Sequence, residues 1–111
     1  MSELDAEPDG IGFYWRPGCG FCMMLDRRLT GLGVPLVKHD IWADPDAADF
    51  VRRHAGGNET VPTVAVGPRV FVNPSADEVL AAMAEEVPHL LDGVEVPEPG
   101  DGGVLRRLFG G

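Results

Sequence analysis

The sequence predicts an α/β fold: a mixed four-stranded sheet with helices on both faces, built in the order βαβαββα. Two observations carry this prediction. Short apolar runs alternate with segments whose apolar residues recur at helical spacing, as expected when strands and helices alternate. Strand–helix–strand units require parallel pairing with right-handed crossovers, whereas the hairpin before the last helix adds antiparallel strands.

Residues 11–15 form the first expected strand, a buried apolar run that leads into the first helix. That helix is expected to begin near Cys19 and to end at Gly31 and Gly33. Its apolar residues recur at helical spacing: Phe21, Met24, Leu25, Leu29 and Leu32. Residues 35–41 then read as the second strand.

The second helix is expected to begin after Asp44, a favourable N-cap, with Pro45 in its first position. A glycine pair at 56–57 marks its end. Its apolar face is formed by Ala47, Phe50, Val51 and His54. Two short apolar strands follow, 63–66 and 69–72, and the Gly-Pro turn between them predicts an antiparallel hairpin.

The last helix has a specific start signal. Ser75, followed three residues later by Glu78, is a capping box, and Pro88 ends the segment. The apolar face of this helix is formed by Ala76, Val79, Leu80, Met83 and Val87.

Composition favours one small domain, because 111 residues with 44% hydrophobic content supply a single core. We place this domain at residues 10–88, between an acidic, flexible N-terminus (1–9) and a Pro/Gly-rich C-terminal tail (89–111). The formal net charge of −9 argues against nucleic acid as a partner. No stretch suits a membrane span and the acidic start lacks the regions of a secretion signal, so we expect a cytoplasmic protein, acting as a monomer.

Cys19 and Cys22 are the only cysteines, and their Cys-x-x-Cys spacing at the start of a helix favours thiol–disulfide chemistry. Free N–H groups at a helix N-terminus, with a nearby cation such as Arg16, lower a cysteine pKa from about 8.5 to roughly 3.5–7.5. We expect Cys19, the more exposed of the two, to attack as a thiolate, and Cys22, closer to the core, to resolve. In a reducing cytoplasm such a pair is more often catalytic than structural.

Zinc binding and an inert buried pair are the alternatives from the residues alone. A zinc site needs further ligands, yet there is no second cysteine pair and the histidines, His39, His54 and His89, are scattered. Gly18 and Gly20 keep the backbone open around Cys19, which argues against an inert pair. We therefore expect no metal site.

The segment Thr60-Val61-Pro62-Thr63-Val64 resembles the Thr-Val-Pro element that glutaredoxins and thioredoxins carry before their third core strand. Together with the Cys-x-x-Cys that precedes it, this element identifies the chain as a member of the thioredoxin superfamily and implies the thioredoxin fold. The resemblance also implies that Thr60, Val61 and Pro62 bind the thiol substrate. It implies a cis peptide bond before Pro62, with the backbone of Val61 beside the active cysteine.

Residues 16–19 and 57–64 look glutaredoxin-like, and residues 73–79, Asn-Pro-Ser-Ala-Asp-Glu-Val, resemble actinobacterial mycoredoxins. This resemblance implies reduction of mixed disulfides between proteins and a low-molecular-weight thiol. Mycothiol, with glutathione as the other possibility, would be a co-substrate, and no cofactor would be bound. Trp15-Arg16 and the Gly-Phe between the cysteines depart from the mycoredoxin pattern, and the first of these departures leaves the identity of the thiol open.

The same resemblance assigns three further thiol-binding residues. Arg16 would steer an anionic group of the thiol, the helix start at Ser75 would bind a carboxylate, and Asp77 would hydrogen-bond an amine or hydroxyl. From the residues alone, Arg16 is equally a solvated side chain, Ser75 a helix cap, and Asp77 a favourable charge at a helix start.

Two other functions stay open. Glutaredoxins with Cys-Gly-Phe-Ser at this place bind a [2Fe–2S] cluster between two chains, and this chain has Cys22 where they have serine. The second thiol favours disulfide closure over cluster retention. The other possibility is a redoxin that thioredoxin reductase reduces directly, without any small thiol.

Overall fold

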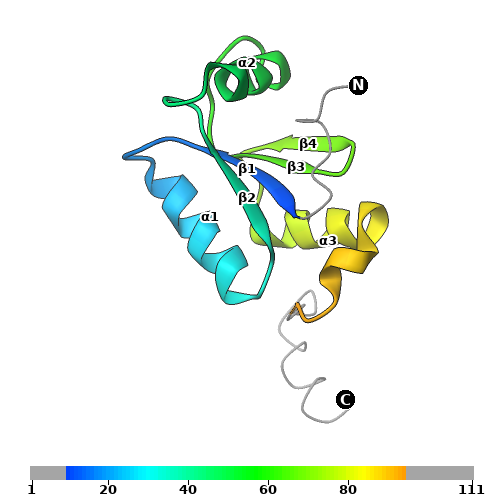
Figure 1. Cartoon of the computed structure of the whole chain (residues 1–111). Helices are drawn as coiled ribbons and strands as arrows, with labels where there is room; N and C mark the ends of the chain where they lie inside the picture. The colour runs from blue at the N-terminus through cyan, green and yellow to red at the C-terminus, as the bar shows by residue number, and fades with distance from the viewer. Residues whose placement is uncertain (1–9, 95–111) are drawn as a thin grey trace.

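The computed structural model describes residues 10–94, and the element order matches the predicted βαβαββα (Figure 1). The predictions for residues 1–9 and 95–111 lie outside the described residues. The elements are β1 (Ile11–Trp15), α1 (Gly20–Gly31), β2 (Leu36–Asp40), α2 (Pro45–His54), β3 (Thr63–Val66), β4 (Arg69–Val72), α3 (Ala76–Glu86) and the 3₁₀-helix η2 (Pro88–Leu91). Only β2 departs from its predicted strand limits, being one residue shorter at each end.

The four strands form one mixed sheet in the order β2-β1-β3-β4. Strand β1 runs parallel to β2 and antiparallel to β3, and β4 closes the hairpin with β3. The prediction of parallel pairing therefore holds for the first strand–helix–strand unit and is wrong for the second. The end of β2 pairs with Trp15 and the start of β3 pairs with Tyr14. After α2 the chain therefore re-enters the sheet at the same end of β1 at which β2 left it, and β3 runs antiparallel to β1.

Helices cover both faces of the sheet, as predicted: α1 and α3 lie on one side and α2 on the other (Figure 1). Each side has its own apolar core. The core beneath α1 and α3 includes Ile11, Phe13, Cys22, Leu25, Leu29, Val64, Val79 and Met83. The core beneath α2 consists of Tyr14, Ile41, Ala47, Ala48, Phe50, Val51 and Ala65. The side chains of β1 and β3 alternate between the two cores, which holds the sheet between them.

The packed part of the chain extends beyond position 88, where the sequence places the end of the domain. Helix η2 follows α3 directly, and Leu90, Leu91 and Val94 pack against the core of α1 and α3. A 3₁₀-helix of four residues is too short for a periodic pattern, so composition alone assigns it to the tail. Within residues 10–94, no helix is long and apolar enough to cross a membrane.

Candidate active site

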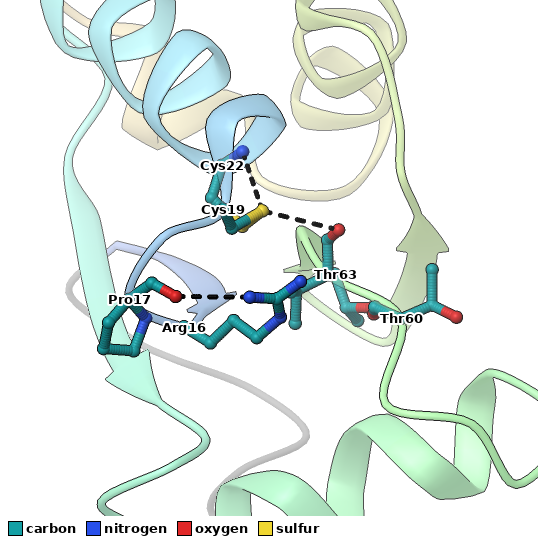
Figure 2. The surroundings of a disulfide bond; sticks show 7 residues. Arg16, Pro17, Cys19, Cys22, Thr60 and Thr63 are labelled. Carbon is teal, nitrogen blue, oxygen red and sulfur yellow. Dashed lines mark hydrogen bonds between the residues drawn. A yellow bond between two sulfur atoms is a disulfide. The ribbon is translucent and has the colours of Figure 1, made fainter.

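Cys19 and Cys22 are joined by a disulfide at the start of α1, directly after β1 and its short loop (Figure 2). Cys19 is the N-cap of α1, and its Sγ accepts a hydrogen bond of 3.1 Å from the backbone N–H of Cys22. The φ of +79° at Gly18, a conformation that residues with a side chain rarely adopt, turns the chain into this cap. The N–H group and the helix dipole both stabilise negative charge on the Cys19 sulfur.

The two cysteines differ in exposure in the predicted direction, although the difference is small. Cys19 is 6% exposed and Cys22 is 1% exposed. Cys19 therefore lies at the surface of the apolar core rather than in solvent, and Cys22 lies inside it. Cys19 is thus the more accessible of the two, which suits the division between an attacking and a resolving thiol.

The loop before β3 meets the disulfide through its backbone. The Val61-Pro62 peptide is cis, as the family resemblance implies, and the carbonyl oxygen of Val61 lies 3.8 Å from Cys19 Sγ. Thr63 fixes this loop because its Oγ1 donates a 2.8 Å hydrogen bond to the carbonyl of Thr60. The Val61 carbonyl belongs to the loop before β3 and the Cys22 N–H to α1, so two separate segments contact the Cys19 sulfur.

A pocket of about 470 Å³ lies beside this loop, between α1 and the start of α3. The backbone N–H of Asn73 donates a 2.7 Å hydrogen bond to the carbonyl of Pro62, which holds the two segments together. The α3 side of the pocket contains Pro62, Asn73, Pro74, Ser75, Ala76 and Asp77. The structure thus brings Pro62, Ser75 and Asp77 together, three of the residues predicted to bind the thiol.

The α1 wall of the pocket consists of residues to which the sequence interpretation gave no binding role. Phe21, Met24, Leu25 and Arg28 line it, and Phe21 and Met24 are 68% and 67% exposed. Their apolar spacing indicated the helix, yet the buried side of α1 consists of Cys22, Leu25 and Leu29. The spacing i, i+3, i+4, i+7 from Phe21 to Arg28 was the available signal that these four residues share one face.

Arg16 and Thr60 do not line this pocket. The Arg16 guanidinium lies 5.4 Å from the centre of the Trp42 ring, a cation–π contact, and donates a 3.2 Å hydrogen bond to the carbonyl of Pro17. Figure 2 shows the Arg16 side chain on the opposite side of Cys19 from α1. Arg16 is therefore positioned by Trp42, and its predicted contact with the thiol stays a prediction.

The helix start at Ser75 forms the predicted capping box. Glu78 N–H donates to Ser75 Oγ at 3.1 Å, and the Ser75 N–H donates to Glu78 Oε1 at 2.8 Å. Both groups are satisfied within the protein, so the cap requires no ligand.

Replacing Ser75 with Ala is expected to lower the free energy of unfolding by about 1 kcal/mol, because α3 loses its N-cap. Urea unfolding measures this loss. Glu78→Gln is the matched control, since glutamine still completes a capping box. An unchanged stability in Ser75→Ala would contradict the cap, and the KM for the small thiol, measured on the same proteins, separates a cap alone from a cap that also contacts the thiol.

Residues 10–94 contain no group of three or more His, Cys, Asp and Glu side chains that could hold a metal ion. The histidines lie away from the cysteines in the sequence, and His54 contacts the carbonyl of Phe50 on α2 through its Nδ1 at 2.9 Å.

Residues 11–72 match the family model described as Glutaredoxin. Proteins of Mycobacterium tuberculosis strains H37Rv and CDC 1551, named "Putative glutaredoxin Rv3198A" and "Putative glutaredoxin MT3292", are each 40% identical to this chain over 76 residues. The alignment covers 68% of this chain and 90% of each relative.

Solved structures show the same fold. The glutaredoxin-like protein NrdH-redoxin from Escherichia coli superposes with a TM-score of 0.56 at 24% identity, covering 64% of this chain and 91% of that one. The holo form of glutaredoxin C1 from Populus tremula x tremuloides gives a TM-score of 0.55 at 22% identity, covering 83% and 92%. These similarities confirm the predicted thioredoxin fold.

Proposed function

This chain belongs to the glutaredoxin family and is a thiol–disulfide oxidoreductase, and from that premise we propose that it reduces mixed disulfides between proteins and mycothiol. It does so as a cytoplasmic monomer, without a bound cofactor. The observation that carries the proposal is the position of Cys19 Sγ: capped by the Cys22 N–H at 3.1 Å, next to the Val61 carbonyl and beside a pocket of about 470 Å³.

The reaction proceeds by thiol–disulfide exchange. The Cys19 thiolate attacks the small-thiol sulfur of a protein–mycothiol disulfide, and the protein leaves as a thiolate that takes up a proton. Cys19 then carries mycothiol as a mixed disulfide. The thiolate of a second mycothiol attacks the mycothiol sulfur of this mixed disulfide and releases the Cys19 thiolate. The mycothiol disulfide that forms is then reduced by the mycothiol reductase.

Cys22 provides the second route. Its thiolate attacks Cys19 Sγ of the mixed disulfide, the Cys19–Cys22 bond forms, and the small thiol leaves. The disulfide in the structure is the product of this route. The oxidised protein then returns to the dithiol by exchange with two reducing thiols.

The choice of mycothiol is supported by the α3 side of the pocket. Residues 73–79 are the mycoredoxin-like segment, and Asn73, Ser75 and Asp77 of this segment line the pocket. The relatives at 40% identity come from an actinobacterium, which fits the same subfamily. Hydroxyl, amide and carboxylate groups at this wall suit a thiol that carries several hydroxyl groups. Glutathione remains the competing co-substrate.

The test is NADPH-coupled reduction of a mixed-disulfide substrate, run in parallel with three electron sources. These are mycothiol with its reductase, glutathione with its reductase, and thioredoxin reductase alone. We expect turnover with mycothiol and at least tenfold less with the other two, a discrimination of about 1.4 kcal/mol. Equal or faster turnover with glutathione would overturn the mycothiol assignment.

Two outcomes identify the alternative functions. Turnover with thioredoxin reductase alone indicates a directly reduced redoxin. No turnover with any source, together with a brown colour after anaerobic purification, indicates a [2Fe–2S] carrier ligated by Cys19.

A further inference from the structure

A second, smaller cavity lies on the other side of α1 from the thiol pocket. Its volume is about 90 Å³, enough for a few water molecules. Cys22 shares this cavity with two charged residues, Asp26 and Lys38, to which the sequence interpretation gave no role. The remaining lining residues are apolar or aromatic: Phe13, Trp15 and Met23.

The two charged side chains reach the cavity from different elements. Asp26 follows Cys22 by four residues on α1, so their side chains are neighbours on one helix face. Lys38 lies on β2, where it pairs with Phe13 of β1. Its Nζ donates a hydrogen bond to Asp26 Oδ2 at 2.8 Å, and Thr30 Oγ1 donates to Asp26 Oδ1 at 2.9 Å.

Asp26 is a carboxylate at neutral pH. Partial burial raises the pKa of Asp26, but hydrogen bonds from Lys38 and Thr30 and the positive charge of Lys38 outweigh this effect and lower the pKa below its usual value. The carboxylate is therefore present when the disulfide reacts, and it forms an ion pair with Lys38.

Opening of the Cys19–Cys22 disulfide creates a charge in this place. A reducing thiolate attacks Cys19 Sγ and bonds to it, the Cys19–Cys22 bond breaks, and its electron pair leaves on Cys22 Sγ. Cys22 is 1% exposed, and burial disfavours a thiolate. The rate of exchange depends on the stability of this leaving thiolate, which later takes up a proton from water.

We propose that Lys38 and Asp26 set the reactivity of Cys22, with the Lys38 ammonium stabilising its thiolate and the Asp26 carboxylate opposing it. The proposal rests on the thiol–disulfide activity and holds for any reducing thiol. Asp26 holds the Lys38 ammonium beside the cavity and partly neutralises its charge. The pair therefore sets how readily Cys22 forms a thiolate, and with it the rate of the route through the Cys19–Cys22 disulfide.

Among residues 10–94, Asp26 and Lys38 are the charged residues that line the cavity with Cys22. Phe13 and Trp15 of β1 line it as well, and Val79 and Leu80 of α3, which belong to the same core as Cys22, are apolar. Arg27 does not line this cavity; it lines a neighbouring groove together with Asp26 and Lys38. The Cys19 thiolate of the reduced protein is a further charge near Cys22, and it is present equally in every variant below.

The experiment measures Cys22 directly in the reduced full-length chain. With [¹³Cβ]cysteine, NMR follows the titration of Cys19 and Cys22 separately. Lys38→Met is expected to raise the Cys22 midpoint by about one pH unit, and Asp26→Asn to lower it by about one unit. In stopped-flow reduction by dithiothreitol at pH 7, read by tryptophan fluorescence, Lys38→Met opens the disulfide about threefold more slowly and Asp26→Asn about threefold faster.

Opposite signs in the two variants separate this role from a structural one. If the ion pair only held α1 against β2, both substitutions would break the same contact and shift Cys22 in the same direction. Lys38→Arg keeps the charge and is expected to stay near the wild type. Arg69 lies on β4, the opposite edge strand from β2, and forms an ion pair with Glu85 of α3; Arg69→Met removes this pair and is expected to leave Cys22 unchanged.

Shifts of the same sign in Lys38→Met and Asp26→Asn, or no shift in either, would overturn the proposal. Both side chains lie at the surface, with 50% and 27% of Lys38 and Asp26 exposed, so the variants are expected to fold. Because dithiothreitol replaces the small thiol, a failure of the mycothiol assignment leaves this result unaffected.

Discussion

Replacing Cys19 with Ser abolishes turnover with every electron source, because a serine hydroxyl is not ionised at neutral pH and forms no mixed disulfide. Cys19 is the sulfur that the Cys22 N–H and the Val61 carbonyl approach, and the more exposed of the two. The rate of the coupled assay is expected to fall to that of uncatalysed exchange. Mass spectrometry of the variant should find no adduct with the small thiol.

Cys22→Ser is the matched control, since it makes the same change three residues later. This variant lacks the second route but keeps the first, so part of the turnover remains. Its mixed disulfide with the small thiol should accumulate, because no neighbouring thiol displaces it. Full activity in Cys19→Ser, or a complete loss in Cys22→Ser with Cys19→Ser still active, would reverse the assignment of the two sulfurs.

Replacing Phe50 with Ala is expected to lower the free energy of unfolding by about 3–5 kcal/mol. Phe50 is fully buried beneath α2, and its ring stacks on Tyr14 with 4.6 Å between centroids. Tyr14 in turn stacks on His39 at 4.7 Å, so the substitution removes the α2 member of a stack that joins α2 to β1 and β2. For a small domain of about 5–15 kcal/mol total stability this is a large share.

Urea unfolding of Phe50→Ala against Phe21→Ala tests this expectation. The substitution is the same, but Phe21 is 68% exposed on α1, so its loss is expected to change the stability by no more than about 0.5 kcal/mol. Equal losses in the two variants would show that the core beneath α2 contributes less than its burial indicates.

The parts of the fold that the sequence predicted have local causes. The Asp44 side chain accepts a hydrogen bond from the Asp46 N–H at the start of α2, and Ser75 and Glu78 form the reciprocal bonds of a capping box at the start of α3. Both caps form as predicted. The hairpin turns at Gly67, whose φ of +57° suits glycine. The cis peptide before Pro62 is different: its prediction came from the family resemblance, since the residues themselves allow either isomer.

The parts that the sequence did not predict depend on contacts between distant segments. The direction of β3 is set by where the chain returns after α2, and no local signal encodes that path. Phe21 and Met24 line the pocket opposite the start of α3 and are exposed there. Their apolar character indicates a helix but does not reveal which side of that helix is buried. The role of Asp26 is equally invisible, because Lys38 reaches it from another element.

Cys19 caps α1 with the same sulfur atom that reacts, which constrains the length of the loop between Trp15 and Cys19. An insertion or deletion there would remove the helix cap and carry the sulfur away from Val61 in a single step. A change in the length of this loop therefore affects both the reactivity of Cys19 and the start of α1. Position 17 can change more freely than the length of the loop, whereas Gly18 is held by its φ of +79°. Sequence variation in this segment should therefore consist of substitutions, while insertions and deletions should occur elsewhere in the chain.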